Sequence, residues 1–579
     1  MITRSMKKRK LPNKKGGQEE EKQNYSGIEI KNIKLQTCDI STTPSKRRTT
    51  ISSKHSSLTE IPLTPSAPPP PPAYSPPRTN FSGLTFPSTM PKQIITNYIP
   101  IRELGKGSFG EVWEAIPKNT QEEKKKNSIP QHVAIKVGLE QKYDPKIGID
   151  AQTLNELSIM SRLKHPNIIE LKEISIGNLD SNKKEEVPLY FAFVLELADR
   201  DLRTHLDSLW GQIYSNTNPV SETKKERYFQ QQLEMVYWIF CGINYLHVNG
   251  IWHLDLKPEN ILVKNNILKI ADFGLSDRKE AAKVPGFKKI TYAYRPSEMQ
   301  CGSTNYNEKA DIWSIGVILM EIFFDLYLGY INVPQTNKES VKEEHNLFKT
   351  MKARIGLPSA EWMAKYVCAP SLCSINPSKE YIEDTTFQYK NMEQTVLRKK
   401  SPKFNFIKNE LYGPQIYNWI WDLISKCLRF NPEERITFEE VLKHPLFTEN
   451  GFCPTCTNCK IVNPYDIKVE YKKDFKFRKE LDPLFQELVN QNINVNPLLV
   501  YASTIYNRYL SVKKLKKEPF NEIGAQSACL VIASKLLNSE ILIRIRDFII
   551  KNTPLTQREL NSLEIEIGNS LGWNFDGPL

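Results

Sequence analysis

The eight residues from His253 to Asn260 (HLDLKPEN) constrain this chain more than any other part of its sequence. Asp255 lies five residues before Asn260, and an Asp-Phe-Gly motif begins twelve positions later at Asp272. In a phosphoryl-transfer site, the first aspartate can accept the proton of a substrate hydroxyl, while the asparagine and the second aspartate can bind Mg²⁺ beside the ATP phosphates. Lys257 then provides a cation near the transferred phosphoryl group. The two motifs at this spacing predict a phosphoryl-transfer site.

A glycine-rich segment precedes these motifs and is expected to lie between two strands, 101–104 and 112–116, which alternating apolar residues predict. Glycine has no Cβ, so its backbone can come close to phosphate groups. Lys136, in a short β run over 133–137, can bind phosphates as a point charge, and Glu156 on a following predicted helix can pair with it. The expected nucleotide-binding residues in this region are Gly105, Lys106, Gly107, Ser108, Phe109, Gly110, Val112, Ala134, Lys136 and Glu156.

These motifs together resemble the catalytic, metal-binding and glycine-rich loops of eukaryotic protein kinases. Within that group, the chain is similar to cyclin-dependent kinases over about 350 residues. The segment 193–198 (FVLELA) resembles the hinge of that family, which implies that Leu195, Glu196 and Ala198 contact the nucleotide. The resemblance implies a bilobal α+β kinase fold over 95–450, with ATP and Mg²⁺ as cofactors. It also implies transfer to Ser or Thr followed by Pro, and a pairing of Arg435 with Glu298.

The chain departs from this family where a regulatory phosphate is expected. By alignment, the phosphorylated threonine of the family is replaced by Gly286, and its three arginine partners are replaced by Asn155, Leu254 and Asp277. A phosphate needs charged partners to order a loop. The sequence therefore predicts a kinase that is independent of activation-loop phosphorylation. The alternative is a nucleotide-binding pseudokinase that serves as a scaffold.

Residues 475–579 are predicted to be helical and resemble the N-terminal cyclin box. Asn496 can cap a helix that Pro497 starts. A capping box at Thr556 opens the last helix, and the segment 521–537 is apolar nearly all round, as expected for the centre of a bundle. In cyclins, residues at the positions of Lys535 and Glu564 grip the kinase near its mobile helix. The resemblance implies activation in cis, and such fusions resemble proteins of large DNA viruses. A dimer formed by domain exchange remains an alternative.

Residues 1–94 are expected to be a disordered basic tail rich in Pro and Ser. This segment holds 16 basic and 6 acidic residues, a net charge of +10 out of +13 for the whole chain. The folded part is therefore close to neutral, and direct nucleic-acid binding is not expected. Lys7-Lys8-Arg9-Lys10 is either a nuclear import signal or a solvated basic patch. Pro71-Pro72-Ala73-Tyr74 resembles the short ligands of WW domains.

The segment 451–474 is expected to be a polar linker. Cys453, Cys456 and Cys459 form two overlapping Cys-x-x-Cys pairs, which are either part of a zinc site or free thiols. No regular disulfide spacing is present among the ten cysteines, and the first residues contain no apolar signal core. An intracellular protein is therefore expected.

Overall fold

The computed structural model describes most of the segments that were expected to be globular. The described residues are 85–87, 90–107, 110–118, 131–138, 147–178, 189–213, 221–279, 281, 283, 291–326, 362, 365–366, 406–450, 477–491, 493–537 and 540–575. Several predictions fall outside them: the import signal and WW ligand of the tail, Ser108 and Phe109, the position of Gly286, and the linker cysteines.

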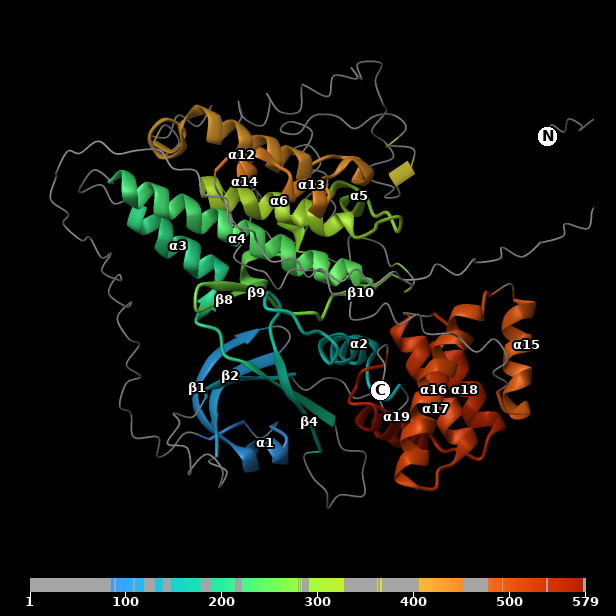
Figure 1. Cartoon of the computed structure of the whole chain (residues 1–579). Coiled ribbons are helices and arrows are strands. Elements are labelled where there is room, and N and C mark those ends of the chain that lie inside the picture. Colours follow the sequence, from blue (N-terminus) through green and yellow to red (C-terminus); the bar gives the residue numbers. More distant parts are fainter. Residues whose placement is uncertain are drawn as a thin grey trace, which may run out of the picture. The chain divides into compact units, whose positions relative to one another are not determined.

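The first half of the kinase-like region is built on a five-stranded antiparallel sheet in the order β1-β2-β3-β5-β4 (Figure 1). The strands are β1 (Tyr98–Gly107), β2 (Gly110–Pro117), β3 (Val133–Val137), β4 (Leu171–Asn178) and β5 (Leu189–Glu196). All the strands predicted from alternating apolar residues lie within these bounds. β-branched residues in β3, which is central in the sheet, explain its stability there.

A short helix, α1 (Lys92–Asn97), precedes the sheet and was not predicted. Ile94 and Met90 are buried in a cluster with Trp113 of β2, and Phe86 meets the Trp113 ring edge-on at 6.0 Å. The packed part of the chain therefore reaches a few residues into the segment 1–94 that was expected to be a tail. Six residues are too few to show a helical period, which is why the sequence did not reveal this helix.

Helix α2 (Ala151–Met160) carries Glu156 and lies between β3 and β4 in the chain. Asp150 is its N-cap, and the side chain of Asp150 accepts a hydrogen bond from the backbone N–H of Thr153 at 2.9 Å. An acidic N-cap also interacts favourably with the positive end of the helix dipole. The helix is buried from Thr153 to Met160, so its position depends on what packs around it.

The second half of the kinase-like region is mainly helical, as expected for a bilobal kinase (Figure 1). Its longer helices are α3 (Leu202–Ile213), α4 (Glu222–Val248), α6 (Lys309–Phe324) and α12 (Gly413–Cys427). Shorter helices are α5 (Ser297–Gln300), α13 (Phe438–Leu442), α14 (Pro445–Thr448), a π-helix at Ile407–Tyr412 and 3₁₀ turns at Pro258–Asn260, Tyr292–Tyr294 and Pro432–Glu434. Five short strands lie in the segments before and between these helices. They are β6 (Arg200–Asp201), β7 (Ile251–Trp252), β8 (Ile261–Lys264), β9 (Ile267–Ile270) and β10 (Asp277–Arg278).

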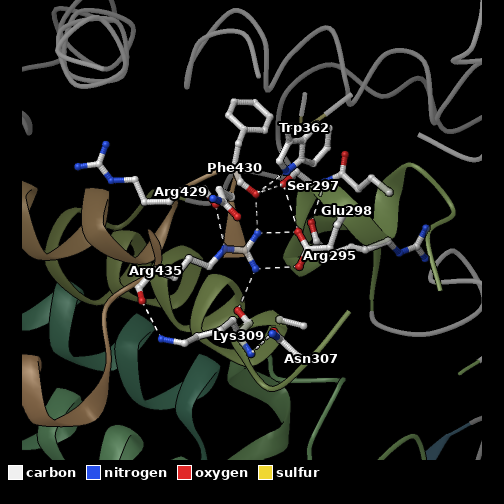
Figure 2. A network of polar contacts seen from close by, with 12 residues as sticks. Arg295, Ser297, Glu298, Asn307, Lys309, Trp362, Arg429, Phe430 and Arg435 are labelled. Atoms are coloured by element: carbon white, nitrogen blue, oxygen red, sulfur yellow. Dashed lines mark hydrogen bonds and ion pairs between the residues drawn. The ribbon is translucent and has the colours of Figure 1, made fainter. Parts of the chain in front are cut away.

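The predicted pair of Arg435 and Glu298 is confirmed, and Figure 2 shows it at the centre of a polar network. The guanidinium binds both carboxylate oxygens, at 2.8 and 2.6 Å, and both side chains are fully buried. The same guanidinium donates to the backbone carbonyls of Arg429, Phe430 and Lys309. Because every charged atom has partners, burial of this pair is compatible with a stable core.

The C-terminal region is an all-helical domain. Its helices are α15 (Asp482–Asn490), α16 (Asn496–Lys516), α17 (Glu522–Leu536), α18 (Leu542–Asn552) and α19 (Gln557–Ser570), with a 3₁₀ turn at Lys479–Leu481. Helix α17 is buried continuously from Gly524 to Leu536, as predicted for the centre of the bundle. The capping box of Thr556 and Glu559 opens α19, also as predicted.

One helix boundary was predicted wrongly. Asn496 was expected to cap α16, but Asn496 is the first helical residue, and Val495 occupies the cap position without a side-chain bond. The side chain of Asn494 instead accepts from the backbone N–H of Asn496 at 3.2 Å. Asn494 and Asn496 both suit the turn before a helix, so the pattern alone does not choose between them.

None of the helices in the described part of the chain combines the length and the apolar character that crossing a bilayer requires.

Candidate active site

Lys136, Glu156 and Asp272 meet between the sheet and the helical lobe, although they are far apart in sequence. The Nζ atom of Lys136 lies 2.7 Å from Oε1 of Glu156 and 3.0 Å from Oδ1 of Asp272. Burial alone would lower the pKa of Lys136, but the two carboxylates outweigh that effect and raise the pKa above its ordinary value. Lys136 likewise outweighs the burial of Asp272 and lowers the pKa of that carboxyl. Lys136 and Asp272 are therefore charged at neutral pH.

Asp255 is buried and held by three side chains of the same site. Its Oδ2 accepts from Lys257 at 2.7 Å and from the Asn260 amide at 3.0 Å. Its Oδ1 accepts from the hydroxyl of Thr291 at 2.7 Å and from the backbone N–H of Thr291 at 2.9 Å. Lys257 also donates to the Thr291 hydroxyl at 3.0 Å. The carboxylate is thus fixed in orientation, which suits a group that must meet an incoming hydroxyl.

Asp311, at the start of α6, holds the backbone of this loop and was not singled out from the sequence. Its carboxylate accepts from the backbone N–H groups of His253 and Leu254, at 2.9 and 2.8 Å, and contacts His247 at 2.9 Å. Leu254 has φ of 58°, a conformation that costs free energy for a residue with a Cβ. The sequence offered one indication of this role, which is an acidic residue in the first turn of an otherwise apolar helix.

Of the predicted hinge residues, Leu195 and Glu196 are the last two residues of β5, and Ala198 follows it. Ala134 of β3 is the register partner of Leu195, which brings these two predicted nucleotide contacts together. Val112 of β2 is the partner of Lys136 in the same sheet. The Glu196 carboxylate binds Lys264 and Lys269, both at 2.8 Å, so its side chain joins the lobes, and Ala198 lies in the loop before β6.

The glycine-rich turn joins β1 and β2, with Gly107 opposite Gly110. Gly110 has φ of +144°, and a Cβ there would lie 2.0 Å from the carbonyl oxygen of Val137, so this position requires glycine. Gly105 has open space around its missing Cβ, as expected for a residue facing a ligand site. Lys106 is exposed and pairs with Glu111 across the turn at 2.6 Å.

Two oxygen atoms suited to a hard cation remain available at this site. Within the described part of the chain, Lys136 alone contacts the Asp272 carboxylate, through Oδ1, so Oδ2 is unengaged. Asn260 uses its amide nitrogen toward Asp255, and no described group donates to its Oδ1. Mg²⁺ in such sites takes one or two protein oxygens together with substrate phosphates. The described residues contain no cluster of three or more His, Cys, Asp or Glu, and this type of site needs none.

The helical domain packs against α2 through α17. Gly148, just before α2, has φ of +76°, and a Cβ there would lie 2.5 Å from Oε2 of Glu564 and 2.7 Å from Oδ1 of Asn561. Trp573 meets the ring of Phe191 in β5 edge-on at 6.1 Å. The domain therefore touches both the helix that carries Glu156 and the sheet that carries Lys136.

Lys535 and Glu564 form a buried ion pair inside the helical domain, with Nζ–O distances of 2.7 and 2.9 Å. Arg546 is a third member that the sequence did not reveal, and its Nη1 lies 3.3 Å from the same carboxylate. Burial lowers the pKa of Lys535, and Glu564 does not restore it because Arg546 opposes that effect. Asp150 of the kinase-like region partly offsets this shift.

Comparison with known proteins assigns both regions. Residues 98–447 match the model of the protein kinase domain, which covers more than half of the chain, so the chain belongs to the protein kinase family. Residues 456–576 match the model of the cyclin N-terminal domain, which begins inside the predicted linker.

The relatives indicate the branch of that family. Cyclin-dependent kinase 11 of Dictyostelium discoideum is 30% identical over 354 residues, which are 60% of this chain and 79% of the relative. Cyclin-dependent kinase G1 of Arabidopsis thaliana is 26% identical over 372 residues, and cyclin-dependent kinase 12 of Caenorhabditis elegans is 28% identical over 357 residues. These matches cover 62% and 61% of this chain and only 51% and 41% of the two relatives. The kinase domain is thus of the cyclin-dependent type, joined here to a cyclin box.

Proposed function

We propose that this protein is a Ser/Thr kinase that transfers the γ-phosphate of ATP to proteins and is activated in cis by its own cyclin box. The observation that carries this proposal is the joint placement of Lys136, Glu156 and Asp272 beside the fixed carboxylate of Asp255. A pseudokinase scaffold would not need these side chains held together in this orientation.

Each residue has a distinct role in the proposed reaction. Asp255 accepts the proton of the substrate hydroxyl, and Lys257 places a positive charge beside the transferred group. Lys136, oriented by Glu156, binds the ATP phosphates as a point charge. Asp272 and Asn260 would hold Mg²⁺, which neutralises charge on the phosphates when bound. Glycines 105, 107 and 110 let the backbone approach the nucleotide closely.

The decisive experiment compares purified wild-type protein with Asp255→Asn, using labelled ATP, Mg²⁺ and a basic protein substrate. We expect phosphorylation on Ser and Thr by the wild type and a loss on the order of 10³-fold in the variant. Ser161→Ala serves as the matched control, because its hydroxyl contacts only the backbone of Ser158. Equal rates for wild type and Asp255→Asn would favour the scaffold.

Activation in cis is supported by the contacts between the box and α2. Two domains of one chain that are joined by a short linker can meet at an effective concentration on the order of millimolar, so no separate supply of cyclin is needed. A chain cut after residue 450 should retain less than about a tenth of the activity, and adding the box back in excess should restore it. Activity that depends steeply on protein concentration would instead indicate domain exchange between two chains.

Substrate preference for Ser or Thr followed by Pro rests on the resemblance to cyclin-dependent kinases and on Arg295, which is largely buried beside Tyr292. A peptide array with all residues varied after the target hydroxyl should show Pro as the favoured one. Thr43 and Ser75 in the tail have the pattern Ser/Thr-Pro-x-Lys/Arg and are proposed internal targets. A flat profile at that position would contradict this preference.

The remaining proposals concern the tail and the source. Lys7–Lys10 would direct nuclear import, and Pro71–Tyr74 would bind a WW domain. Replacing the four basic residues by alanine and following a fluorescent fusion in cells tests the first. A pull-down with isolated WW domains, compared with Tyr74→Ala, tests the second. The likeness to kinase–cyclin fusions of large DNA viruses remains a prediction.

A further inference from the structure

A buried arginine fastens the start of the activation segment to α2. Arg278 lies in β10, which pairs with β7 directly before the catalytic loop, and only 3% of Arg278 is exposed. Its Nη1 donates to Oδ1 of Asn155, and its Nη2 donates to the hydroxyl of Ser158 at 2.6 Å. Both acceptors are buried side chains of α2, and Asn155 immediately precedes Glu156.

The amide of Asn155 continues this connection in the other direction. Its Nδ2 donates to the backbone carbonyl of Ser276 at 2.6 Å, and the hydroxyl of Ser276 donates to the carbonyl of His253 at 3.1 Å. Asn155 therefore both accepts from the activation segment and donates to it. We call Arg278, Asn155, Ser158 and Ser276 the Arg278 clamp. It links α2, the segment after Asp272 and the catalytic loop in one buried network.

A second cation holds the same stretch of chain. The Nζ of Lys283 lies 3.6 Å from the ring centroid of Trp252 in β7 and donates to the backbone carbonyl of Arg278 at 2.7 Å. Trp252 is itself packed edge-on against Tyr306. A cation over an indole face is attracted by the ring, most strongly where water is excluded. The strand that carries Arg278 is thus also held by a contact that does not involve α2.

The sequence positions show what this network replaces. Asn155 stands where related kinases have an arginine on this helix, and Arg278 is next to Asp277, the position of another such arginine. In those kinases the helix contributes the cation and the segment contributes an anion, the phosphate. Here the segment contributes the cation and the helix contributes neutral acceptors. The donor therefore lies on the segment and the acceptors lie on the helix, which reverses the arrangement, and no phosphate is needed to complete the contact.

We propose that the Arg278 clamp positions α2 for the kinase reaction in the absence of any phosphate. The clamp acts through Glu156, one residue along the helix, and so keeps Glu156 within reach of Lys136. Arg278, Asn155 and Ser158 are positioning residues, because none of them touches the reacting atoms. This inference rests on the proposed function, since its effect on rate presupposes phosphoryl transfer.

The first test measures kcat/KM for phosphatase-treated protein, with mass spectrometry confirming an unmodified activation segment. Full activity is expected for the wild type. Arg278→Met should lose about 10- to 100-fold, as expected for two charge-assisted hydrogen bonds, and Arg278→Lys should recover part of it. Ser158→Ala should lose about 3- to 10-fold, while the control Ser161→Ala on the same helix should match the wild type. A large loss on phosphatase treatment, or an Arg278→Met variant with normal kcat/KM, would overturn the proposal.

A double-mutant cycle separates positioning from general stability. In a Glu156→Gln background, Arg278→Met should lower kcat/KM by less than about 3-fold more, because the clamp acts through Glu156 and that carboxylate is already absent. A fully additive loss would contradict the inference. If Arg278→Met does not fold, the same cycle with Ser158→Ala distinguishes positioning of Glu156 from a general effect on stability.

Hydrogen exchange tests the Arg278 clamp independently of catalysis. Amides of α2 should exchange faster in Ser158→Ala than in Ser161→Ala, and unchanged exchange would overturn the clamp. An inactive wild-type protein whose α2 responds in this way would contradict the proposed function and leave the clamp standing. An active wild type that is insensitive to Arg278→Met and Ser158→Ala would contradict the clamp alone.

Discussion

Two lysine–glutamate pairs, one in each region of the protein, have opposite electrostatic environments. Lys136 faces two carboxylates, Glu156 and Asp272, in a partly open site where their side chains are 16%, 11% and 26% exposed. Lys535 shares a single carboxylate, Glu564, with a second cation and is completely buried. The pKa is raised for Lys136 and lowered for Lys535, although the Nζ–O distance is 2.7 Å in both.

The difference shows that a short ion-pair distance does not define a role. The first group has an excess of negative charge and solvent access, as needed to receive a magnesium ion and the phosphates of a nucleotide. The second has an excess of positive charge and no solvent, and Asp150 at the start of α2 lies close enough to offset part of it. One pair is suited to chemistry, and the other joins α17 to α19 inside the helical domain.

The largest expected effect comes from removing the lysine of the first pair. Lys136→Met should lower kcat/KM on the order of 10³-fold, because it removes a charged contact to the phosphates. It should lower the unfolding free energy less than the loss of Glu564 does, because the side chains around Lys136 are partly exposed. The control is Lys118→Met, an exposed lysine of the same lobe whose Nζ contacts only the Ile95 carbonyl. Steady-state kinetics and calorimetry on the same samples test this separation. A stability loss without a kinetic loss would reverse the roles assigned to the pairs.

Removing the carboxylate of the second pair should act on stability. Glu564→Gln leaves two buried cations, Lys535 and Arg546, without a counter-charge and should lower the unfolding free energy of the box by about 3 kcal/mol. Glu566→Gln, on the same helix, removes the charge of a carboxylate that is 44% exposed and pairs with Lys513. The amide oxygen of the variant side chain can still accept from the Tyr509 hydroxyl, which lies 2.6 Å from Glu566, so this change should cost less than about 1 kcal/mol. Calorimetry of the intact chain measures both variants. Equal losses would show that the buried pair has no special importance.

The junction between the regions can be tested with two glycines of similar conformation. Gly148→Ala adds a Cβ that would lie 2.5 Å from Glu564 and should lower activity about 10-fold. Gly250→Ala imposes a similar backbone strain, since its φ is +68°, but the nearest atom lies 3.9 Å away. We expect a loss of less than about 3-fold for Gly250→Ala. Similar kinetic losses would mean that contact with the box does not control the site.

The smallest expected effect is a difference in pH dependence. Lys535 has a lowered pKa in the folded state, so the unfolded state binds more protons between that pKa and 10.5. Its contribution to stability should therefore rise with pH as the solution becomes alkaline. Lys136 has a raised pKa, so its contribution is complete at lower pH and is lost only as pH rises beyond 10.5.

Unfolding free energies of wild type and Lys535→Met between pH 7 and 10 test this sign. The wild type should gain stability relative to the variant as pH increases. The difference in unfolding free energy between wild type and Lys136→Met should not change with pH over the same range. A difference that shrinks with rising pH would contradict a lowered pKa of Lys535 in the folded state.

The site was largely predictable because its residues lie in short motifs with fixed spacing. Lys136, Glu156, Asp255, Lys257 and Asp272 were predicted from the sequence, and the structure brings them together as described above. The strands around Lys136 and the buried helix α17 follow from alternating and continuous apolar patterns. These are properties of residues close to one another in the chain.

What the sequence did not reveal depends on partners distant in the chain. Arg278 meets Asn155 across 123 positions, and Arg546 reaches Glu564 because α18 and α19 both pack against α17. Arg278 also lies one position from where an alignment places a charged residue, so a comparison by position assigns it no role. Contacts of this kind follow from packing, and no local spacing encodes them.

The buried pair of Arg435 and Glu298 has a consequence for how the protein is made. The two residues are 137 positions apart, so at roughly 5–20 residues per second the ribosome takes roughly 7–27 s to supply the partner of Glu298. The helical lobe cannot close its core before then. The helix that lies against Gly148, α19, is synthesised later still. Under the proposed activation in cis, the kinase would remain inactive until α19 has been made and has folded against it.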